Sequence, residues 1–166
     1  MSRTLPFLVV AVVLASGCPS DGTRPGAPID VTRITPEAPN TVGYSGLKDP
    51  LRQAIFDAAT FAGVWSQAFA GRSPAPAVPA VDFATEFVVV AALGEHPTGG
   101  YMIEVAGALA DAGGVLVGIR ATAPGKGCPV TLAFTQPLDI VKIKRPSAGA
   151  VPVRFEEKLV STDCGQ

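Results

Sequence analysis

The feature that most constrains the fold is an unbroken apolar run over residues 87–93, Phe-Val-Val-Val-Ala-Ala-Leu. Seven apolar residues in a row, with β-branched valines near the centre, predict a strand that is buried on both faces. The loop over residues 94–100, Gly-Glu-His-Pro-Thr-Gly-Gly, contains Pro, which fixes φ, and Gly, which permits positive φ. Residues 101–105, Tyr-Met-Ile-Glu-Val, then alternate as in a strand with one solvated face. We therefore predict a central β-hairpin with a shaped loop at its tip.

A helix is predicted to begin at Asp49-Pro50, because Asp is a favourable N-cap and Pro is favoured at the first helical position. Apolar residues then recur at steps of three and four and make one continuous stripe, and Gly71 is the predicted stop. Because of this spacing, the tryptophan on the stripe is interpreted as core rather than as a ligand platform. The stripe comprises Leu51, Ile55, Ala58, Ala62, Trp65 and Phe69.

Further alternating segments predict strands that begin near Val115, Val130, Leu138 and Val151. They are separated by a turn at residues 111–114 and by loops at 122–127 and 144–149. One helix followed by about six strands indicates an α+β domain over residues 41–166. We expect an N-terminal amphipathic helix packed on a mainly antiparallel sheet or small barrel.

The N-terminus has the pattern of an export signal: Arg3, an apolar segment over residues 5–15 and small residues before Cys18. The apolar segment is too short to span a bilayer comfortably. Residues 14–18 resemble a bacterial lipobox, with Ala15 where Leu is usual. We therefore predict a lipoprotein signal peptide over residues 1–17, with Cys18 as the acylated residue that anchors the protein to a membrane of the bacterial cell envelope. The alternative is an ordinary cleaved signal with an incidental cysteine.

Residues 18–40 are rich in Pro, Gly and Ser and poor in apolar side chains, which predicts a flexible tether. If Cys18 carries lipid, Cys128 and Cys164 remain as a pair. They are predicted to form a disulfide in an exported chain, and two unrelated thiols are the alternative. The chain lacks a Cys-x-x-Cys motif and has one histidine, so neither a metal nor another cofactor is expected.

Sequence motifs for catalysis are weak. His96 is the single histidine and no Gly-x-Ser-x-Gly motif is present, so His96 is interpreted as a loop residue that contributes a contact. Neighbouring Glu156 and Glu157 would point to opposite faces of a strand and could not act on one substrate. The net charge of −1 and the lack of a basic stripe argue against nucleic-acid binding. We expect a non-enzymatic protein that binds a protein partner through preorganised loops.

Several segments together resemble the PrcB C-terminal domain family. The most distinctive is Pro-Thr-Gly-Gly-Tyr at residues 97–101, which follows the apolar run. The resemblance implies a lipoprotein that associates with and stabilises a surface protease complex. The other segments are Gly-Tyr-Ser-Gly at 43–46, Gly-Lys-Gly-Cys-Pro-Val-Thr at 125–131, Thr-Gln-Pro at 135–137 before Ile140-Val141, and Val-Arg-Phe at 153–155.

A second resemblance is to chagasin-like inhibitors of cysteine peptidases. It rests on three loops in the same order, at residues 96–101, 125–127 and 145–146. The departures are His96 for Asn, Gly99 for Thr, and Ser147 where an aromatic residue is expected. Both resemblances imply loop contacts with a peptidase, and we expect an extracytoplasmic one. Tyr101 could equally serve in cross-strand packing. Alternatives are a peptidase inhibitor, an enzyme that uses His96, and a structural envelope domain. The predicted contact residues are His96, Pro97, Thr98, Gly99, Gly100, Tyr101, Gly125, Lys126, Gly127, Arg145 and Pro146.

Overall fold

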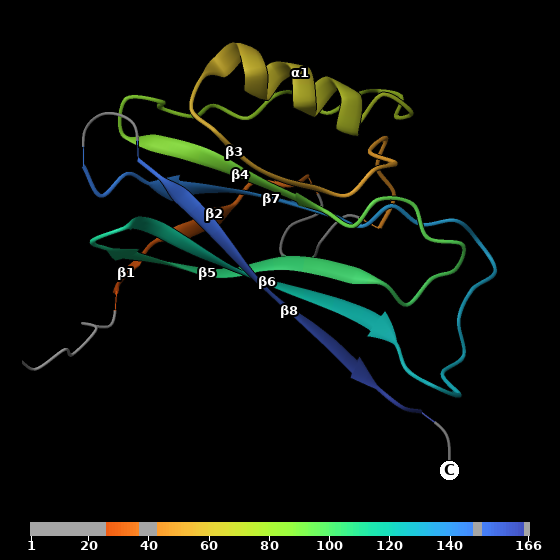
Figure 1. Ribbon diagram of the computed structural model, residues 1–166. Helices are drawn as coiled ribbons and strands as arrows, with labels where there is room; N and C mark the ends of the chain where they lie inside the picture. Colours follow the sequence, from red (N-terminus) through yellow and green to blue (C-terminus); the bar gives the residue numbers. More distant parts are fainter. Residues whose placement is uncertain (1–25, 37–42, 148–150, 165–166) are drawn as a thin grey trace, which may run out of the picture.

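The computed structural model describes residues 26–36, 43–147 and 151–164, and these form two sheets that pack face to face (Figure 1). The strand orders are β1-β5-β6-β8, here called sheet A, and β2-β7-β4-β3, here called sheet B. The predicted α+β fold is therefore wrong: the domain is a mainly β sandwich with one short helix in the described residues. The elements are β1 Ala27–Ile29, β2 Val31–Arg33, β3 Leu51–Ile55, α1 Ala58–Ala68, β4 Glu86–Ala92, β5 Met102–Asp111, β6 Gly114–Pro124, β7 Leu138–Lys144 and β8 Val153–Thr162.

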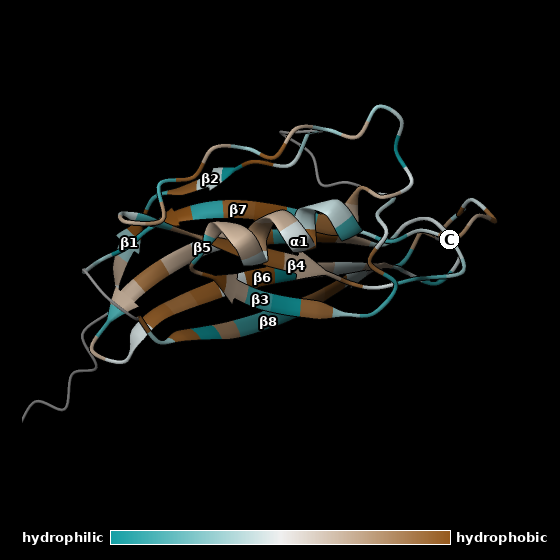
Figure 2. Cartoon of the chain, turned by 90° about the horizontal axis from the view of Figure 1, so that it is seen from above, coloured by the Kyte–Doolittle hydropathy of each residue, from teal (hydrophilic) through white to brown (hydrophobic). Residues whose placement is uncertain are grey.

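Strand β4 is the centre of the packing, and the prediction that it is buried on both faces is confirmed. Val88, Val90 and Ala92 belong to a cluster that also contains Phe61 and Trp65 of α1. The intervening side chains of β4 belong to a second cluster, which fills the space between the two sheets. Figure 2, a view from above, shows α1 lying over strands that are coloured largely hydrophobic. An unbroken apolar run is required because each face of β4 meets a separate core.

The predicted hairpin between the apolar run and the segment after Tyr101 is wrong. Strand β4 pairs with β3 and β7, whereas β5 pairs with β1 and β6. Hairpin loops usually contain two to five residues, and the connection over residues 93–101 is longer. That length allows the chain to cross between sheets that pack about 10 Å apart.

The predicted helix also begins too early. Residues Leu51–Ile55 form β3, which pairs antiparallel with β4, and α1 begins only at Ala58. The true N-cap is Asp57, whose carboxylate accepts a 2.8 Å hydrogen bond from the Thr60 backbone N–H. Trp65 is buried as core, as predicted, and its indole N–H donates to a backbone carbonyl of the following loop. In the described residues, no helix combines the length and apolarity needed to cross a membrane.

Part of the predicted tether is folded. Strands β1 and β2 lie within residues 26–36 and pair with β5 and β7, so the chain passes from one sheet to the other on this side of the sandwich. Backbone pairing with an existing sheet edge can order a segment of little apolar content, which composition alone does not reveal. Cys18, the predicted signal peptide and the rest of the predicted tether lie outside the described residues.

A buried carboxylate joins the two sheets. Asp139 on β7 is fully buried, and its oxygens accept hydrogen bonds from Arg33 Nε at 2.7 Å and Arg33 Nη2 at 2.8 Å. It also accepts a 2.8 Å bond from the Val105 backbone N–H, next to an irregularity in the β5–β6 pairing. The hydrogen bonds to Asp139 raise the pKa of Arg33. Arg33 and Asp139 lie in sheet B and Val105 in sheet A, so the contact holds the layers together.

Candidate protein-binding surface

Two loops meet at one end of the sandwich, the loop over residues 93–101 after β4 and the loop over residues 125–137 after β6 (Figure 1). His96 and Thr135 exchange two backbone hydrogen bonds, of 2.8 and 2.9 Å. The Gly99 N–H donates to the Thr131 carbonyl at 2.9 Å. These bonds make the two segments one unit, which we call the paired loops.

The glycines of the first loop are needed for this contact. A Cβ at Gly99 would collide with Thr131 Oγ1. Gly100 has φ of +87°, and a Cβ there would lie 3.0 Å from Pro124 Cβ and 3.2 Å from Val130 Cγ1. The buried Thr135 hydroxyl donates to the Thr98 carbonyl at 2.8 Å. The Pro-Thr-Gly-Gly segment therefore requires glycine at its last two positions, because the second loop lies directly against it.

His96 and Tyr101 stack on each other, with ring centroids 3.9 Å apart and planes inclined by 14°. His96 Nε2 is buried and makes no hydrogen bond in the described part of the protein. The stack occupies the ring faces of both residues and stiffens the loop, as expected for aromatic packing. Within the described ranges, no group of three or more His, Cys, Asp and Glu side chains could hold a metal ion.

The second loop is fastened to the C-terminal segment after β8. Cys128 and Cys164 form a disulfide, with Cα atoms 4.6 Å apart. The Lys126 N–H donates to Asp163 Oδ1 at 2.7 Å, and the Cys164 N–H donates to the Lys126 carbonyl at 3.0 Å. The predicted contact residues Gly125, Lys126 and Gly127 thus lie beside the end of the chain, in a loop with little freedom to move.

Arg145 and Pro146 lie at the opposite end of the sandwich, so the predicted contact residues do not share one surface. In the β4–β7 register, Lys144 lies opposite Glu86, at the start of β4, whereas the first loop follows the end of β4. Arg145 Nε donates to the Glu86 carbonyl at 3.1 Å, and its guanidinium lies over the Phe56 ring at 5.1 Å. Arg145 is therefore a packing residue here. Residues 148 and 149 of this predicted loop lie outside the described residues.

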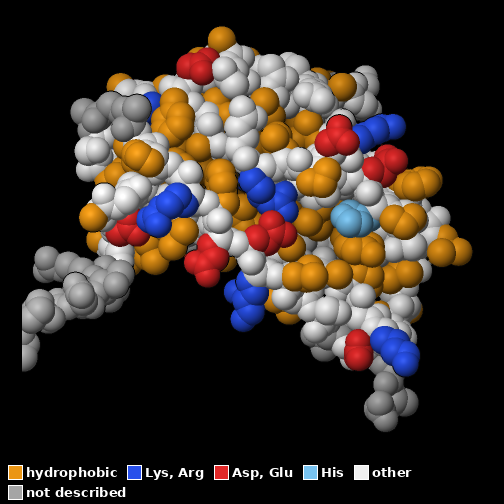
Figure 3. Space-filling view, viewed as in Figure 1, with side chains coloured by type: hydrophobic (Ala, Val, Ile, Leu, Met, Phe, Trp, Pro, Cys, Tyr) orange, Lys and Arg blue, Asp and Glu red, His pale blue; other side chains and the backbone are white. Residues whose placement is uncertain are grey.

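The structure reveals an exposed apolar group that the sequence analysis did not predict. Val130, Leu132 and Phe134 alternate as in a strand, but they lie in the second loop, where Leu132 is 92% exposed and Phe134 62%. Met102, which begins β5, is 56% exposed. We call Met102, Val130, Leu132 and Phe134 the loop-end surface. Figure 3 shows hydrophobic side chains gathered around the histidine at this end.

Flanking prolines were the available signal for this loop. Pro129 and Pro137 bracket the segment, and proline is uncommon inside paired strands because it lacks the N–H donor. The predicted strand from Val130 to Phe134 is wrong because no strand among the described residues offers its edge there. The segment instead makes isolated backbone bonds to the first loop.

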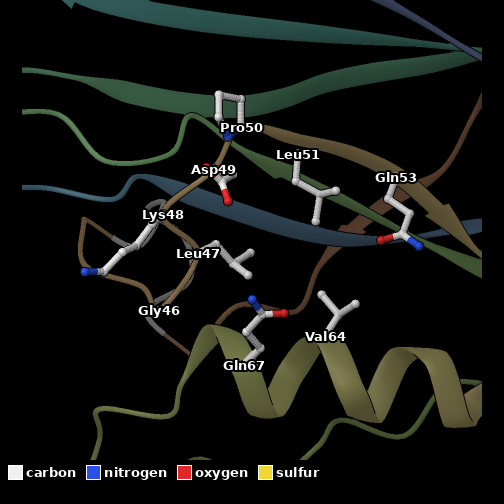
Figure 4. Close-up of a pocket in the computed structure, with 9 residues that line it drawn as sticks. All are labelled: Gly46, Leu47, Lys48, Asp49, Pro50, Leu51, Gln53, Val64 and Gln67. Atoms are coloured by element: carbon white, nitrogen blue, oxygen red, sulfur yellow. The ribbon is translucent and has the colours of Figure 1, made fainter.

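A separate hollow of about 440 Å³ lies between the start of β3 and α1 (Figure 4). It combines charged side chains with apolar ones and contains none of the predicted contact residues. Lys48, in its wall, approaches Glu95 of the first loop at 3.9 Å. The lining residues are Gly46, Leu47, Lys48, Asp49, Pro50, Leu51, Gln53, Val64 and Gln67.

A family model described as PrcB C-terminal matches residues 87–144. The match begins in β4, ends with β7 and contains both paired loops and the loop-end surface. The segments at residues 43–46 and 153–155 lie outside it. No curated protein and no solved structure matches the chain significantly. The resemblance predicted from the sequence is thereby confirmed over residues 87–144, where the chain is similar to the PrcB C-terminal family.

Proposed function

We propose that this protein is a non-catalytic, protein-binding subunit of an extracytoplasmic protease complex, held at the cell envelope by a lipid on Cys18. The observation that carries the proposal is the loop-end surface, which presents exposed apolar side chains on loops of fixed shape. The family match over residues 87–144 is consistent with association with a protease complex.

The energetics favour a protein partner at this surface. Burial of a large apolar side chain is worth about 1.5–3 kcal/mol. Leu132 and Phe134 have most of that gain still available, since they are 92% and 62% exposed. The paired loops and the disulfide reduce the entropy that binding must overcome, because the backbone is already ordered. Apolar side chains clustered on a rigid surface are typical of protein interaction sites.

Two features support the proposed location. The sequence before Cys18 has the lipobox pattern, and acyl chains on that residue would anchor the protein. The Cys128–Cys164 disulfide suits a compartment in which disulfides persist. Labelled palmitate should enter the wild-type chain and be absent from Cys18→Ala. Label that remains in this variant would disprove the anchor.

The proposed partner contact is tested by affinity capture of the full chain from envelope extract, with mass spectrometry of the recovered proteins. We expect wild type to recover a protease and Leu132→Ser/Phe134→Ser to lose it. The matched control is Tyr44→Ser/Val78→Ser, which removes two side chains of 58% and 46% exposure outside the loop-end surface. Equal recovery by both double variants would show that the loop-end surface is not the contact.

A further inference from the structure

Strand β8 has a long edge that no other strand of the described protein covers. It pairs in parallel with β6 from Val153 to Thr162 and is the last strand in the order of sheet A. Sheet B ends on the same side with β3. Arg52 on β3 bridges to Glu157 on β8, with Arg52 Nη2 2.7 Å from Glu157 Oε2. An edge strand of this length presents a row of backbone donors and acceptors to another chain.

The outward face of β8 carries two opposite charges without an ion-pair partner in the described residues. Glu156 lies opposite Gly118 on β6, which has no side chain to contact it. Lys158 lies opposite Arg120, which already pairs with Glu104 at 2.7 Å. Edge strands often carry charges that repel a second strand. Here the two charges differ in sign and are two residues apart, so an antiparallel copy of the same strand would match them.

The inward face of β8 has a matching apolar pattern. Phe155 packs against the core between the sheets, whereas Leu159, four residues further along, is 68% exposed. Glu157 lies midway between them and is neutralised by Arg52. The exposed Leu159 has no covering element in the described structure, although it lies on the same face of β8 as the partly buried Phe155.

We propose that β8 pairs antiparallel with β8 of a second copy of this chain, about a two-fold axis through Glu157. Glu156 then lies opposite Lys158 of the second copy, and Phe155 opposite Leu159 of the second copy, each pair occurring twice. Opposite charges and apolar pairs directly across two strands are stabilising. A two-fold axis moved by one residue would place Glu156 opposite itself or Lys158 opposite itself. In the proposed register Glu157 also lies opposite Glu157 of the second copy, but each of these carboxylates is already paired with Arg52 of its own chain. Glu156 and Lys158 have no such partner in the described residues, so they select this register, and sheet A becomes continuous across the dimer.

The first test is charge reversal, with the mass of the full chain measured in detergent micelles over a concentration series. We expect wild type to be a dimer and each of Glu156→Lys and Lys158→Glu to raise the dissociation constant about tenfold or more, since like charges then face each other twice. The double variant Glu156→Lys/Lys158→Glu restores opposite pairs and should return the constant to near wild type. Lys144→Glu, which reverses an exposed charge on β7, is the control and should have no effect.

A monomeric wild type, or a dimer that neither single reversal weakens, would overturn the proposal. The register is tested by oxidation of Glu157→Cys, which we expect to give a cross-linked dimer on a non-reducing gel. In the matched variant Ser161→Cys the two sulfurs would be about 26 Å apart along the paired strands. Cross-linking of Ser161→Cys but not of Glu157→Cys would refute this pairing.

Different variants test dimerisation and protease binding, so failure of one proposal can be told from failure of the other. Glu156→Lys should lose the dimer and still recover the protease in the capture experiment, whereas Leu132→Ser/Phe134→Ser should do the reverse.

Discussion

Replacement of Asp139 by Ala should destabilise the domain more than any loss of a surface ion pair. The variant leaves the Arg33 guanidinium, whose side chain is 24% exposed, without its carboxylate. It also removes the acceptor of the buried Val105 N–H. Removing one partner of a buried pair costs about 3–5 kcal/mol, because the other charge is left desolvated. The unsatisfied Val105 N–H contributes about 1–3 kcal/mol to that cost.

The assay is thermal unfolding at pH 7, with denaturant titration to obtain the free energy. A loss of 3–5 kcal/mol corresponds to a drop of about 10–20 °C in Tm for a domain of this size. The control is Glu104→Ala, which removes the carboxylate of an exposed 2.7 Å pair with Arg120 from the strand that also carries Val105. Exposed pairs contribute about 0–1 kcal/mol, so the control should lower Tm by only a few degrees.

Similar losses of unfolding free energy in Asp139→Ala and Glu104→Ala would refute the reasoning. They would show that burial of Asp139 does not increase the contribution of its ion pair to stability. The double variant Asp139→Ala/Arg33→Ala adds a second check. It removes the Arg33 cation together with the Asp139 carboxylate, so its loss of unfolding free energy should be smaller than the sum of the losses in the two single variants.

Three further predictions concern the loops and the helix cap. Gly100→Ala should lower the unfolding free energy by about 1–2 kcal/mol in denaturant titration, because φ is +87° and the new Cβ meets Pro124. The control is Gly71→Ala, where a Cβ meets open space, and it should change the unfolding free energy by less than about 0.5 kcal/mol. Equal effects of the two variants would contradict the steric argument. Cys128→Ser/Cys164→Ser should lose about 4 kcal/mol by the chain-entropy relation, given the separation of 36 residues, and an unchanged denaturation midpoint would contradict this. A hydrogen bond from the Thr60 N–H holds the pKa of Asp57 below its ordinary 3.8, so this bond stabilises the fold above that pH and the stabilisation is lost as the pH falls below it. Asp57→Asn keeps the helix cap without a titrating group, so its Tm should fall less on acidification than that of wild type. Identical Tm profiles in acid would exclude Asp57 as a contributor to acid unfolding.

The sequence predicts a structural feature correctly where that feature depends on residues close together in the chain. The apolar run at residues 87–93 predicted a strand buried on both faces, since a run without polar residues has no face to offer to water. Trp65 was predicted as core from helical spacing alone, and α1 does bury it. The predicted helix start at Asp49-Pro50 is wrong because residues 51–55 pair with β4, so the helix begins only after Asp57.

The candidate surface was predictable only in part. The Pro-Thr-Gly-Gly-Tyr loop was singled out by its proline and glycines, and it forms half of the paired loops. Leu132 and Phe134 were assigned to a strand, because alternation of apolar residues does not say whether another element covers them. Their exposure follows from the absence of a strand edge beside the second loop in the described protein, which is a non-local property.

From the sequence come the similarity of residues 87–144 to the PrcB C-terminal family, the buried strand β4, the proline and glycine positions of the loop over residues 94–100 and the pattern of an export signal before Cys18. Tertiary structure alone decided that β4 and β5 lie in different sheets, that residues 27–33 complete both sheets, and that Arg145 lies at the opposite end from His96. The physical reason is that turn and burial preferences act between near neighbours, whereas strand pairing depends on backbone edges supplied from far along the chain.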